Sequence, residues 1–380
     1  MEMQLRLASE VPDPPRRALP LLDTVLDAQA DITYHETVVR SVLNPPAATG
    51  IGCWSLNPYV GCAFGCAYCY ARYAHRYVME RADAARVPAA ASGEALPAWL
   101  AFERRVLVKR DAPALVRQAL GRHAARHARL LAGLEAVVVG TATDPYQPAE
   151  RRFRVTRGVL EALAEHDGMR VVIITKSPLV VRDLDVLARL AVRSRLSVHV
   201  SLITLDRALA RRIEPRAPTP EARLRAIQRL AEAGIDVGVN VMPVLPGITD
   251  DPHALEALVR QVATVGARHL AAGALRLQPA ARDRYLPWVA DAFPELAARY
   301  RATYARGPHA GERYRAGLRE HIEAVCARYG IATRSYDDQR ARAEAQAKQA
   351  ASGGTSRARA RVPGAGVDTG PGATQLAFDI

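Results

Sequence analysis

The sequence predicts an α/β fold, namely a partial (β/α)6 barrel with an N-terminal extension and a helical C-terminal cap. Short β-branched runs recur at intervals of about 30 to 40 residues, which is the spacing of strand–helix units. The stretches between these runs carry the apolar periodicity and the end signals of helices. Such units wind right-handed, and six of them do not close an eight-stranded barrel. We therefore expect an open, partial barrel of parallel strands.

Six strands are predicted, and each is short and apolar enough to be buried in a parallel sheet. They cover residues 54–60, 136–140, 170–175, 196–203, 235–242 and 270–277. The clearest helix covers residues 219–233, because Thr219 is a favourable N-cap, Pro220 suits the first turn and Gly234 ends the helix. The other expected elements are a helical segment at 70–80, a loop insertion at 81–98, a strand at 106–108 and a helix at 113–131.

The regions on either side of the barrel differ from it in composition. Residues 1–50 form an extension whose prolines argue against long regular elements. The core is expected at 51–280, and a helical C-terminal region at 281–336 packs against it. Residues 337–380 are rich in Arg, Ala, Gly and Ser, so we expect a disordered tail that buries no core.

The composition excludes some classes of protein. Five cysteines, three of them clustered, do not form a disulfide framework, and a reducing cytoplasmic compartment is expected for them. The N-terminus lacks the pattern of a signal peptide, and no apolar run is long enough to span a membrane. The formal net charge of +13 suits contact with nucleic acid. A bias toward Ala and Arg explains the charge equally well, because the chain has only three lysines.

One stretch carries the strongest chemical signal. Residues 61–72 read GCAFGCAYCYAR, which spaces Cys62, Cys66 and Cys69 as C-x3-C-x2-C. Thiolates are soft ligands that suit iron–sulfur clusters and zinc. Three of them can hold one side of a cubane cluster and leave one iron open, and the two glycines let the backbone fold close to it. Two alternatives stay open: a zinc site completed by His75, and unrelated core thiols.

These residues resemble the motif of the radical S-adenosylmethionine (SAM) superfamily, in which an aromatic residue, here Tyr68, precedes the last cysteine. The longer string NPYVGCAFGCAYCYAR is similar to the branch of spore photoproduct lyase and the DNA repair photolyase-like proteins. The resemblance covers most of residues 51–277. It implies a [4Fe–4S] cluster bound by the three cysteines and SAM bound at the open iron. It further implies a one-electron reductant of the flavodoxin or ferredoxin type, which drives cleavage of SAM to methionine and a 5′-deoxyadenosyl radical.

Polar residues follow successive predicted strands, where the active sites of such barrels lie. Thr143 and Asp144 follow the second strand, Lys176 the third, Ser201 the fourth and Asn240 the fifth. We expect these residues to contact SAM. The Asp144 carboxylate suits the amino group, and the compact Lys176 ammonium suits the carboxylate. A plain helix-entry turn is the alternative for Asp144.

The resemblance also suggests catalytic residues. Tyr68 and Tyr70 occupy the places of the lyase tyrosines that relay the radical, and shielding of the cluster is the alternative role. The lyase cysteine that donates a hydrogen atom corresponds to Thr141, whose bonds to hydrogen are too strong for that task. We therefore expect that this chain is not a true spore photoproduct lyase. Glu214 and Arg216 match a signature of the branch, and an ion pair at a helix entry is the alternative for them.

Partners and substrate are expected from the resemblance and the charge together. Nucleic acid is the leading expectation for the substrate. The alternatives are a radical SAM enzyme that acts on a small molecule or a protein, and a non-catalytic zinc- or nucleic-acid-binding protein. The final residues Gln375 to Ile380, QLAFDI, resemble bacterial sliding-clamp-binding peptides, so a clamp is a weaker candidate partner. Cys53 and Cys326 are expected to be core thiols.

Overall fold

The computed structural model of the chain describes residues 21–29, 31–49, 52–72 and 97–333. Six parallel strands form its centre, and they coincide with the six predicted ones. Their bounds are β4 Trp54–Leu56, β7 Ala136–Val139, β8 Arg170–Thr175, β9 Arg195–Ser201, β10 Asp236–Val244 and β11 His269–Ala274. The predicted α/β class and its parallel sheet are thereby confirmed.

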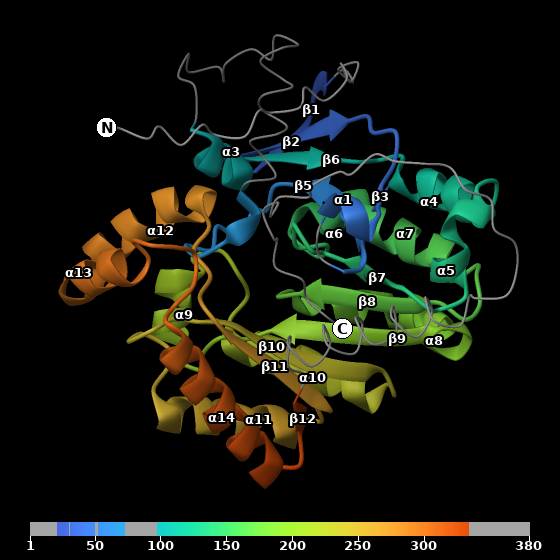
Figure 1. Ribbon diagram of the computed structural model, residues 1–380. Coiled ribbons are helices and arrows are strands. Elements are labelled where there is room, and N and C mark those ends of the chain that lie inside the picture. Colours follow the sequence, from blue (N-terminus) through green and yellow to red (C-terminus); the bar gives the residue numbers. More distant parts are fainter. Residues whose placement is uncertain (1–20, 30, 50–51, 73–96, 334–380) are drawn as a thin grey trace, which may run out of the picture.

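Two short strands extend this sheet at its edges. β12 (Ala332–Thr333) pairs parallel with β11, and β3 (Leu43–Asn44) pairs antiparallel with β4. The strand order is β12-β11-β10-β9-β8-β7-β4-β3 (Figure 1). Among the described residues the pairings leave the sheet open at β3 and β12.

Helices connect the parallel strands, as in other right-handed strand–helix units. The predicted helix at 219–233 is α10, and the Thr219 hydroxyl caps it by accepting a hydrogen bond from the Ala222 amide at 3.4 Å. The predicted helix at 113–131 is interrupted after Gly121. The connecting helices are α4 Ala112–Leu120, η2 Ala124–His127, α5 Ala128–Leu131, α6 Ala149–Phe153, α7 Val155–Leu163, η3 Pro178–Asp183, α8 Leu184–Arg193, α9 Arg207–Ile213, α10 Pro220–Glu232 and α11 Pro252–Thr264.

A second, smaller sheet lies at the top of the molecule in Figure 1. Its order is β1-β2-β6-β5. The bounds are β1 Leu21–Gln29, β2 Ile32–Thr37, β5 Tyr59–Val60 and β6 Arg105–Val108. The expectation of no long regular element in residues 1–50 was wrong, because β1 and β2 form an antiparallel pair. Two of the prolines that motivated it, Pro45 and Pro46, instead lie at the start of the short helix α1 (Pro46–Thr49).

The strand predicted at 54–60 is in fact two strands in two sheets. β4 pairs with β7, whereas β5 pairs with β6. The break falls at Asn57 and Pro58. Proline has no amide N–H to continue a strand ladder, and the Pro58 carbonyl accepts from the Lys109 amide at 3.2 Å. The cysteine loop therefore follows β5 of the small sheet rather than the first parallel strand.

The C-terminal region is helical, as predicted. It contains α12 Pro279–Ala292, α13 Pro294–Thr303 and α14 Glu312–Arg328. α12 packs against η1 (Tyr70–Arg72), which ends the cysteine loop, and against α3 (Ala98–Arg104). α14 packs against β11, β12 and α11. Cys326 on α14 and Cys53 before β4 are both buried, as expected.

Several expectations concern residues outside the described ranges. These are most of the segment at 70–80, most of the insertion at 81–98, the zinc-ligand candidate His75, the tail 337–380 and the peptide at 375–380. Within the described ranges, no helix has both the length and the apolar character that crossing a membrane would require.

Candidate active site

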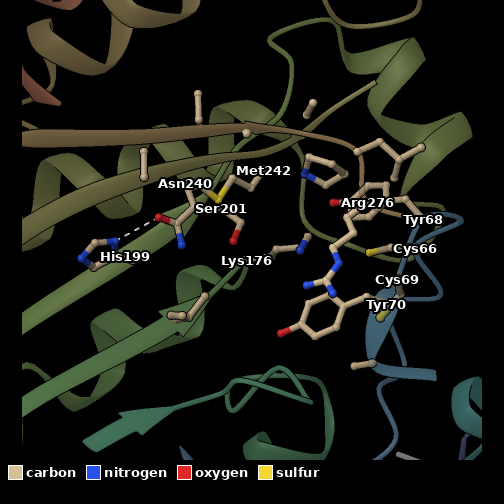
Figure 2. A pocket seen from close by; sticks show the side chains of 18 of the residues that line it. Cys66, Tyr68, Cys69, Tyr70, Lys176, His199, Ser201, Asn240, Met242 and Arg276 are labelled. Atoms are coloured by element: carbon tan, nitrogen blue, oxygen red, sulfur yellow. Dashed lines mark hydrogen bonds between the residues drawn. The ribbon is translucent and has the colours of Figure 1, made fainter. Parts of the chain in front are cut away.

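A cavity of about 540 Å³ lies at the carboxyl ends of the parallel strands, a size that suits small-molecule ligands. All ten residues predicted for the site line this cavity, so the fold brings them together. They are Cys62, Cys66, Tyr68, Cys69, Tyr70, Thr143, Asp144, Lys176, Ser201 and Asn240. Figure 2 labels Cys66, Tyr68, Cys69, Tyr70, Lys176, Ser201 and Asn240 among them.

The cysteine loop, residues 61–72, is shaped by two glycines with positive φ. Gly61 has φ of 88° and Gly65 has φ of 66°, values that residues with a Cβ rarely adopt. A Cβ on Gly61 would lie 2.8 Å from the Phe102 carbonyl oxygen, and one on Gly65 would lie 2.9 Å from Arg216 Nη2. The loop thus needs glycine for both its conformation and its close packing.

Two arginines bind carbonyl oxygens of the loop. Arg72 Nη2 donates to the Cys66 carbonyl at 2.7 Å, and Arg216 Nε donates to the Ala63 carbonyl at 2.7 Å. Glu103 on α3 joins the two arginines, with contacts of 2.6 Å to Arg72 and 3.0 Å to Arg216. The carbonyls are therefore satisfied by side chains of the protein.

The opposite side of the loop is held by two residues that follow β7. Thr143 Oγ1 donates to the Gly61 carbonyl at 2.6 Å. Gln147 Nε2 donates to the same carbonyl at 3.1 Å, and its Oε1 accepts from the Ala63 amide at 3.0 Å. Gln147 is fully buried, and sequence reasoning missed it. Its only local signal is its position in the turn after the second strand.

The three thiols face the cavity from a buried loop. Burial raises the pKa of each of them, and for Cys62 the value reaches about 12. Backbone amides of Phe64 and Asp144 hydrogen-bond the Cys62 sulfur and act in the opposite direction. A bound metal stabilises the thiolate and so removes this penalty.

Among the described residues, no three His, Cys, Asp or Glu side chains converge as ligands of a single metal ion would. A cubane cluster takes each cysteine on a different iron, so its ligands need not converge on one point.

Glu214 is the centre of a buried ionic group beside the loop. Its carboxylate accepts a hydrogen bond from the Tyr68 hydroxyl and pairs with Arg223, and Lys176 Nζ lies 3.9 Å away. Burial raises the Glu214 pKa, but the charges of Arg223 and Lys176 outweigh burial and the net direction is downward. Arg216 pairs with Glu103 instead, so Glu214 and Arg216 do not form an ion pair with each other.

Asp144 links the ends of two neighbouring strands. Its Oδ1 accepts from Thr175 Oγ1 at 2.7 Å and from the Tyr146 amide at 2.9 Å. Its Oδ2 accepts from the Lys176 amide at 2.7 Å. Asp144 therefore positions Lys176 as well as lining the cavity, and its Oδ2, which accepts one of these hydrogen bonds, retains lone-pair capacity for a further donor.

Lys176 carries its ammonium group into the cavity. Nζ lies 5.6 Å from the centroid of the Tyr68 ring. Burial lowers the pKa of Lys176, but a Cys66 thiolate and the Glu214 carboxylate outweigh burial and raise it. The group thus stays positively charged and suits an anionic ligand.

The model of the radical SAM superfamily matches residues 56–258, which is more than half of the chain. The chain belongs to the radical SAM superfamily. It is an enzyme of the radical SAM class, which removes the non-catalytic alternative.

An uncharacterized protein of Mycobacterium tuberculosis is 37% identical to this chain over 303 residues, and the match covers 79% of this chain and 82% of that protein. An uncharacterized protein of Methanocaldococcus jannaschii is 26% identical over 211 residues, covering 56% of this chain and 67% of its own.

Solved structures of spore photoproduct lyase share the fold. One mutant, with bound AdoMet and dinucleoside spore photoproduct, superposes with a TM-score of 0.54 at 15% identity, covering 79% of this chain and 81% of that chain. A second mutant gives a TM-score of 0.55 at 15% identity, covering 82% and 87%. At this identity the likeness concerns the fold alone.

The radical SAM cavity ends in polar groups on β9 and β10. Asn240 Oδ1 lies 3.0 Å from His199 Nδ1 (Figure 2). His199 Nε2 lies 3.0 Å from Nε2 of His269, a β11 residue that does not line the cavity. Ser201 lines the same part of the wall, and its carbonyl accepts from Arg223 Nη1 at 2.9 Å. Sequence reasoning did not predict a role for these two histidines, because a residue inside a buried strand is expected to be part of the core.

Thr141 and Tyr70 lie in contact at the end of β7. The Tyr70 hydroxyl donates to the Thr141 carbonyl. Thr141 Oγ1 accepts from Asn57 Nδ2 at 2.9 Å and lies 2.5 Å from Ser55 Oγ. The Thr141 hydroxyl is therefore part of a buried polar network that ties β4 to β7.

Arg276 is a cavity residue that sequence reasoning missed. It follows β11, in a stretch that was assigned to the last strand as far as residue 277, whereas the strand ends at Ala274. Its side chain is 9% exposed and extends into the cavity (Figure 2). The presence of arginine at the end of a buried strand was the available signal.

Proposed function

We propose that Cys62, Cys66 and Cys69 bind a [4Fe–4S] cluster and that the enzyme cleaves SAM reductively to methionine and a 5′-deoxyadenosyl radical. The observation that carries this proposal is the arrangement of the site. Three thiols on one loop share a cavity with polar residues that come from four successive strands, β7 to β10, or from the turns after them. In that arrangement, cofactor chemistry and the groups that hold SAM meet in one place.

The residues of the loop fit such a cluster. Thiolates are its usual ligands, and amides directed at a cysteine sulfur are the hydrogen bonds that tune cluster potentials. The two glycines keep the backbone close, and Arg72 and Arg216 hold loop carbonyls on the protein side. When bound, the cluster supplies the electron that breaks a carbon–sulfur bond of SAM.

The proposed SAM contacts divide by charge. Lys176 pairs with the carboxylate and Asp144 accepts from the amino group, while Thr143, Ser201 and Asn240 offer polar atoms to the rest of the molecule. Tyr68 and Tyr70 remain candidates for radical relay. Since Glu214 orients the Tyr68 hydroxyl, a structural role for that tyrosine is equally served by the geometry.

The substrate we propose first is nucleic acid, supported by the fold shared with spore photoproduct lyase and by the positive charge. A small molecule or a protein is the second candidate. The reductant is a one-electron donor of the flavodoxin or ferredoxin type, and the sliding clamp stays a weaker candidate partner through Gln375 to Ile380. A cytoplasmic location accords with free thiols.

The test is anaerobic reconstitution of the full chain, followed by iron and sulfide analysis and a SAM-cleavage assay. We expect about four iron and four sulfide per chain. Ala at Cys62, Cys66 or Cys69 abolishes both the cluster and cleavage. Cys53→Ala and Cys326→Ala are the matched controls, since both thiols lie outside the cavity lining and leave the cluster intact. Stoichiometric zinc without any cluster would overturn the proposal.

A further inference from the structure

Four basic residues form one side of the cavity, and we call them the basic wall. They are Arg276, His309, Arg315 and Arg319. Arg276 and His309 are bridged through their backbones. Arg315 and Arg319 lie one helical turn apart on α14 and so share one helix face. The basic wall is therefore built by β11 and the C-terminal region.

The wall runs from the interior of the cavity to its mouth. Arg276 is buried, whereas His309 and Arg319 are exposed and Arg315 is half-buried. Burial lowers the pKa of His309, and the nearby charges of Arg276 and Arg315 lower it further. The His309 ring is thus close enough to both guanidinium groups for their charge to disfavour its protonated form, and a bound anion relieves that repulsion.

The charge of the whole lining is positive. Among the residues that line the cavity, Lys176, Arg276, Arg315 and Arg319 outnumber the acidic Asp144 and Glu323. Behind the lining, Arg315 pairs with Glu312, and Lys176 Nζ lies 3.9 Å from Glu214. The Asp144 carboxylate already accepts hydrogen bonds from Thr175, Tyr146 and Lys176. SAM adds a sulfonium, an ammonium and a carboxylate group, so it brings a net positive charge of its own. The occupied cavity therefore favours a substrate that brings negative charge.

The position of the wall separates it from the SAM-binding half. The superfamily match ends at residue 258, before β11 begins at His269. The cysteines and the proposed SAM contacts lie within the match, and every residue of the basic wall lies beyond it. The wall thus belongs to the part of the chain where enzymes with one cofactor differ in what they act on.

We propose that the basic wall binds a phosphate group of the substrate, with Arg276 deepest in the cavity and Arg315 and Arg319 at its mouth. This rests on the proposed function, because it names the substrate class of the same site. Arginine suits the role, since its planar fork donates two hydrogen bonds to one phosphate. The wall reaches solvent, so the phosphate can belong either to a small nucleotide or to a nucleic-acid strand whose remainder stays outside.

The experiment is calorimetric titration of the full-length, cluster-loaded enzyme with SAM present and oxygen excluded. The probes are inorganic pyrophosphate, a dinucleotide and a short single-stranded oligonucleotide. We expect Arg276→Gln and Arg315→Gln each to weaken dinucleotide binding by about tenfold or more, the loss expected for a charge-assisted hydrogen bond. Arg193→Gln is the matched control, because Arg193 pairs with Asp167 on the surface and does not line the cavity.

The dinucleotide and the oligonucleotide probes distinguish the two possible sources of the phosphate. Oligonucleotide binding that is much tighter than dinucleotide binding, and that falls in the two wall variants, supports the wall and assigns it to nucleic acid. Equal binding of both, weakened by the same variants, supports the wall and assigns it to a small nucleotide. Affinities that are the same in wild type and in both wall variants overturn the inference.

Two further measurements keep the result interpretable. Arg276→Lys retains the charge without the fork, and we expect it to recover part of the lost affinity. Cluster content and SAM cleavage are measured on each preparation. Wild-type enzyme that cleaves SAM but binds none of the phosphate probes overturns the basic wall alone. A chain that binds pyrophosphate through the wall but takes up no cluster overturns the proposed function alone.

Discussion

Asp144 and Lys176 are the residues on which we expect SAM binding to depend most directly. The Asp144 carboxylate holds the Lys176 backbone amide at 2.7 Å, while the Lys176 ammonium lies beside Glu214 and Tyr68. One side chain therefore positions the other. Their effects on SAM binding should couple, as those of residues in one hydrogen-bonded network generally do.

We expect Asp144→Ala and Lys176→Ala each to weaken SAM binding by about 1 to 3 kcal/mol, the cost of losing a charged hydrogen bond. Asp144→Ala should also lower the thermal midpoint, because it leaves three buried donors without their acceptor. Equilibrium SAM binding and thermal unfolding of the loaded enzyme measure the two effects. Asp167→Ala, an exposed carboxylate, is the control. An unchanged dissociation constant in both variants would mean that SAM binds elsewhere.

The cysteine loop is the element on which the proposed iron–sulfur cluster depends. It is clamped from α3 and the segment after α9 on one side and from the turn after β7 on the other. Outside the short helix η1, the backbone-to-backbone hydrogen bonding within residues 61–72 consists of the Cys69 amide donating to the Cys66 carbonyl at 3.2 Å. Its shape is therefore imposed by neighbouring elements, so we expect distant arginines to affect cluster retention.

Arg216→Ala tests this clamp. The change removes the hydrogen bond to the Ala63 carbonyl and the contact with Glu103, which together should cost about 1 to 3 kcal/mol of local stability. We expect faster iron loss to a chelator, followed by absorbance, with the thiol ligands unchanged. Arg225→Ala on the exposed side of α10 is the matched control. Equal rates of iron loss in the two variants would show that the clamp is dispensable.

The pairing of β10 with β11 contains a second sensitive contact. Gly238 lies opposite His269, and a Cβ on Gly238 would lie 2.0 Å from His269 Nε2. Gly238→Ala should therefore overpack the sheet and cost about 1 to 3 kcal/mol of unfolding free energy, measured by urea denaturation. Gly317→Ala in α14 is the control, because nothing lies within 4 Å of its Cβ position. We expect that control to be neutral or stabilising, and a neutral Gly238→Ala would contradict the packing argument.

At the scale of the whole molecule, the enzyme combines a core that matches the radical SAM superfamily with a helical C-terminal region that lies beyond the match. The strand ends and cysteine loop lie within the region that matches the superfamily, whereas α12 to α14 lie beyond it. α12 packs on the end of the cysteine loop and α14 supplies one side of the cavity. The C-terminal region thus contacts both the end of the cysteine loop and the cavity.

This arrangement bears on the relation to spore photoproduct lyase. The chain shares the fold, but Thr141 stands where the resemblance places the hydrogen-donating cysteine, and its hydroxyl is engaged with Asn57. We expect SAM cleavage without efficient repair of a synthetic spore-photoproduct dinucleotide, measured by anaerobic product analysis. Lyase itself is the positive control. Repair at a rate comparable with lyase would refute this expectation and would make Cys53 the next candidate donor to test.

The sequence alone determined the features that depend on neighbours along the chain. The cysteine spacing, the six β-branched runs and the cap at Thr219 are local patterns, and each was found in place. The common location of the strand ends could be predicted from these local patterns, because parallel strands separated by helices must present their carboxyl ends on one side. Thr143, Asp144, Lys176, Ser201 and Asn240 line one cavity for that reason, whereas the cysteine loop reaches the same cavity from the small sheet.

Only the tertiary structure decided the features that depend on residues far apart in sequence. Tyr68 and Glu214 are 146 positions apart, and the choice of Arg223 rather than Arg216 as the partner of Glu214 follows from how α10 packs. Gln147 and the break at Asn57 likewise depend on the meeting of two sheets. A periodic pattern says which face of an element is buried, but the partner across that face is set by the topology that brings the elements together.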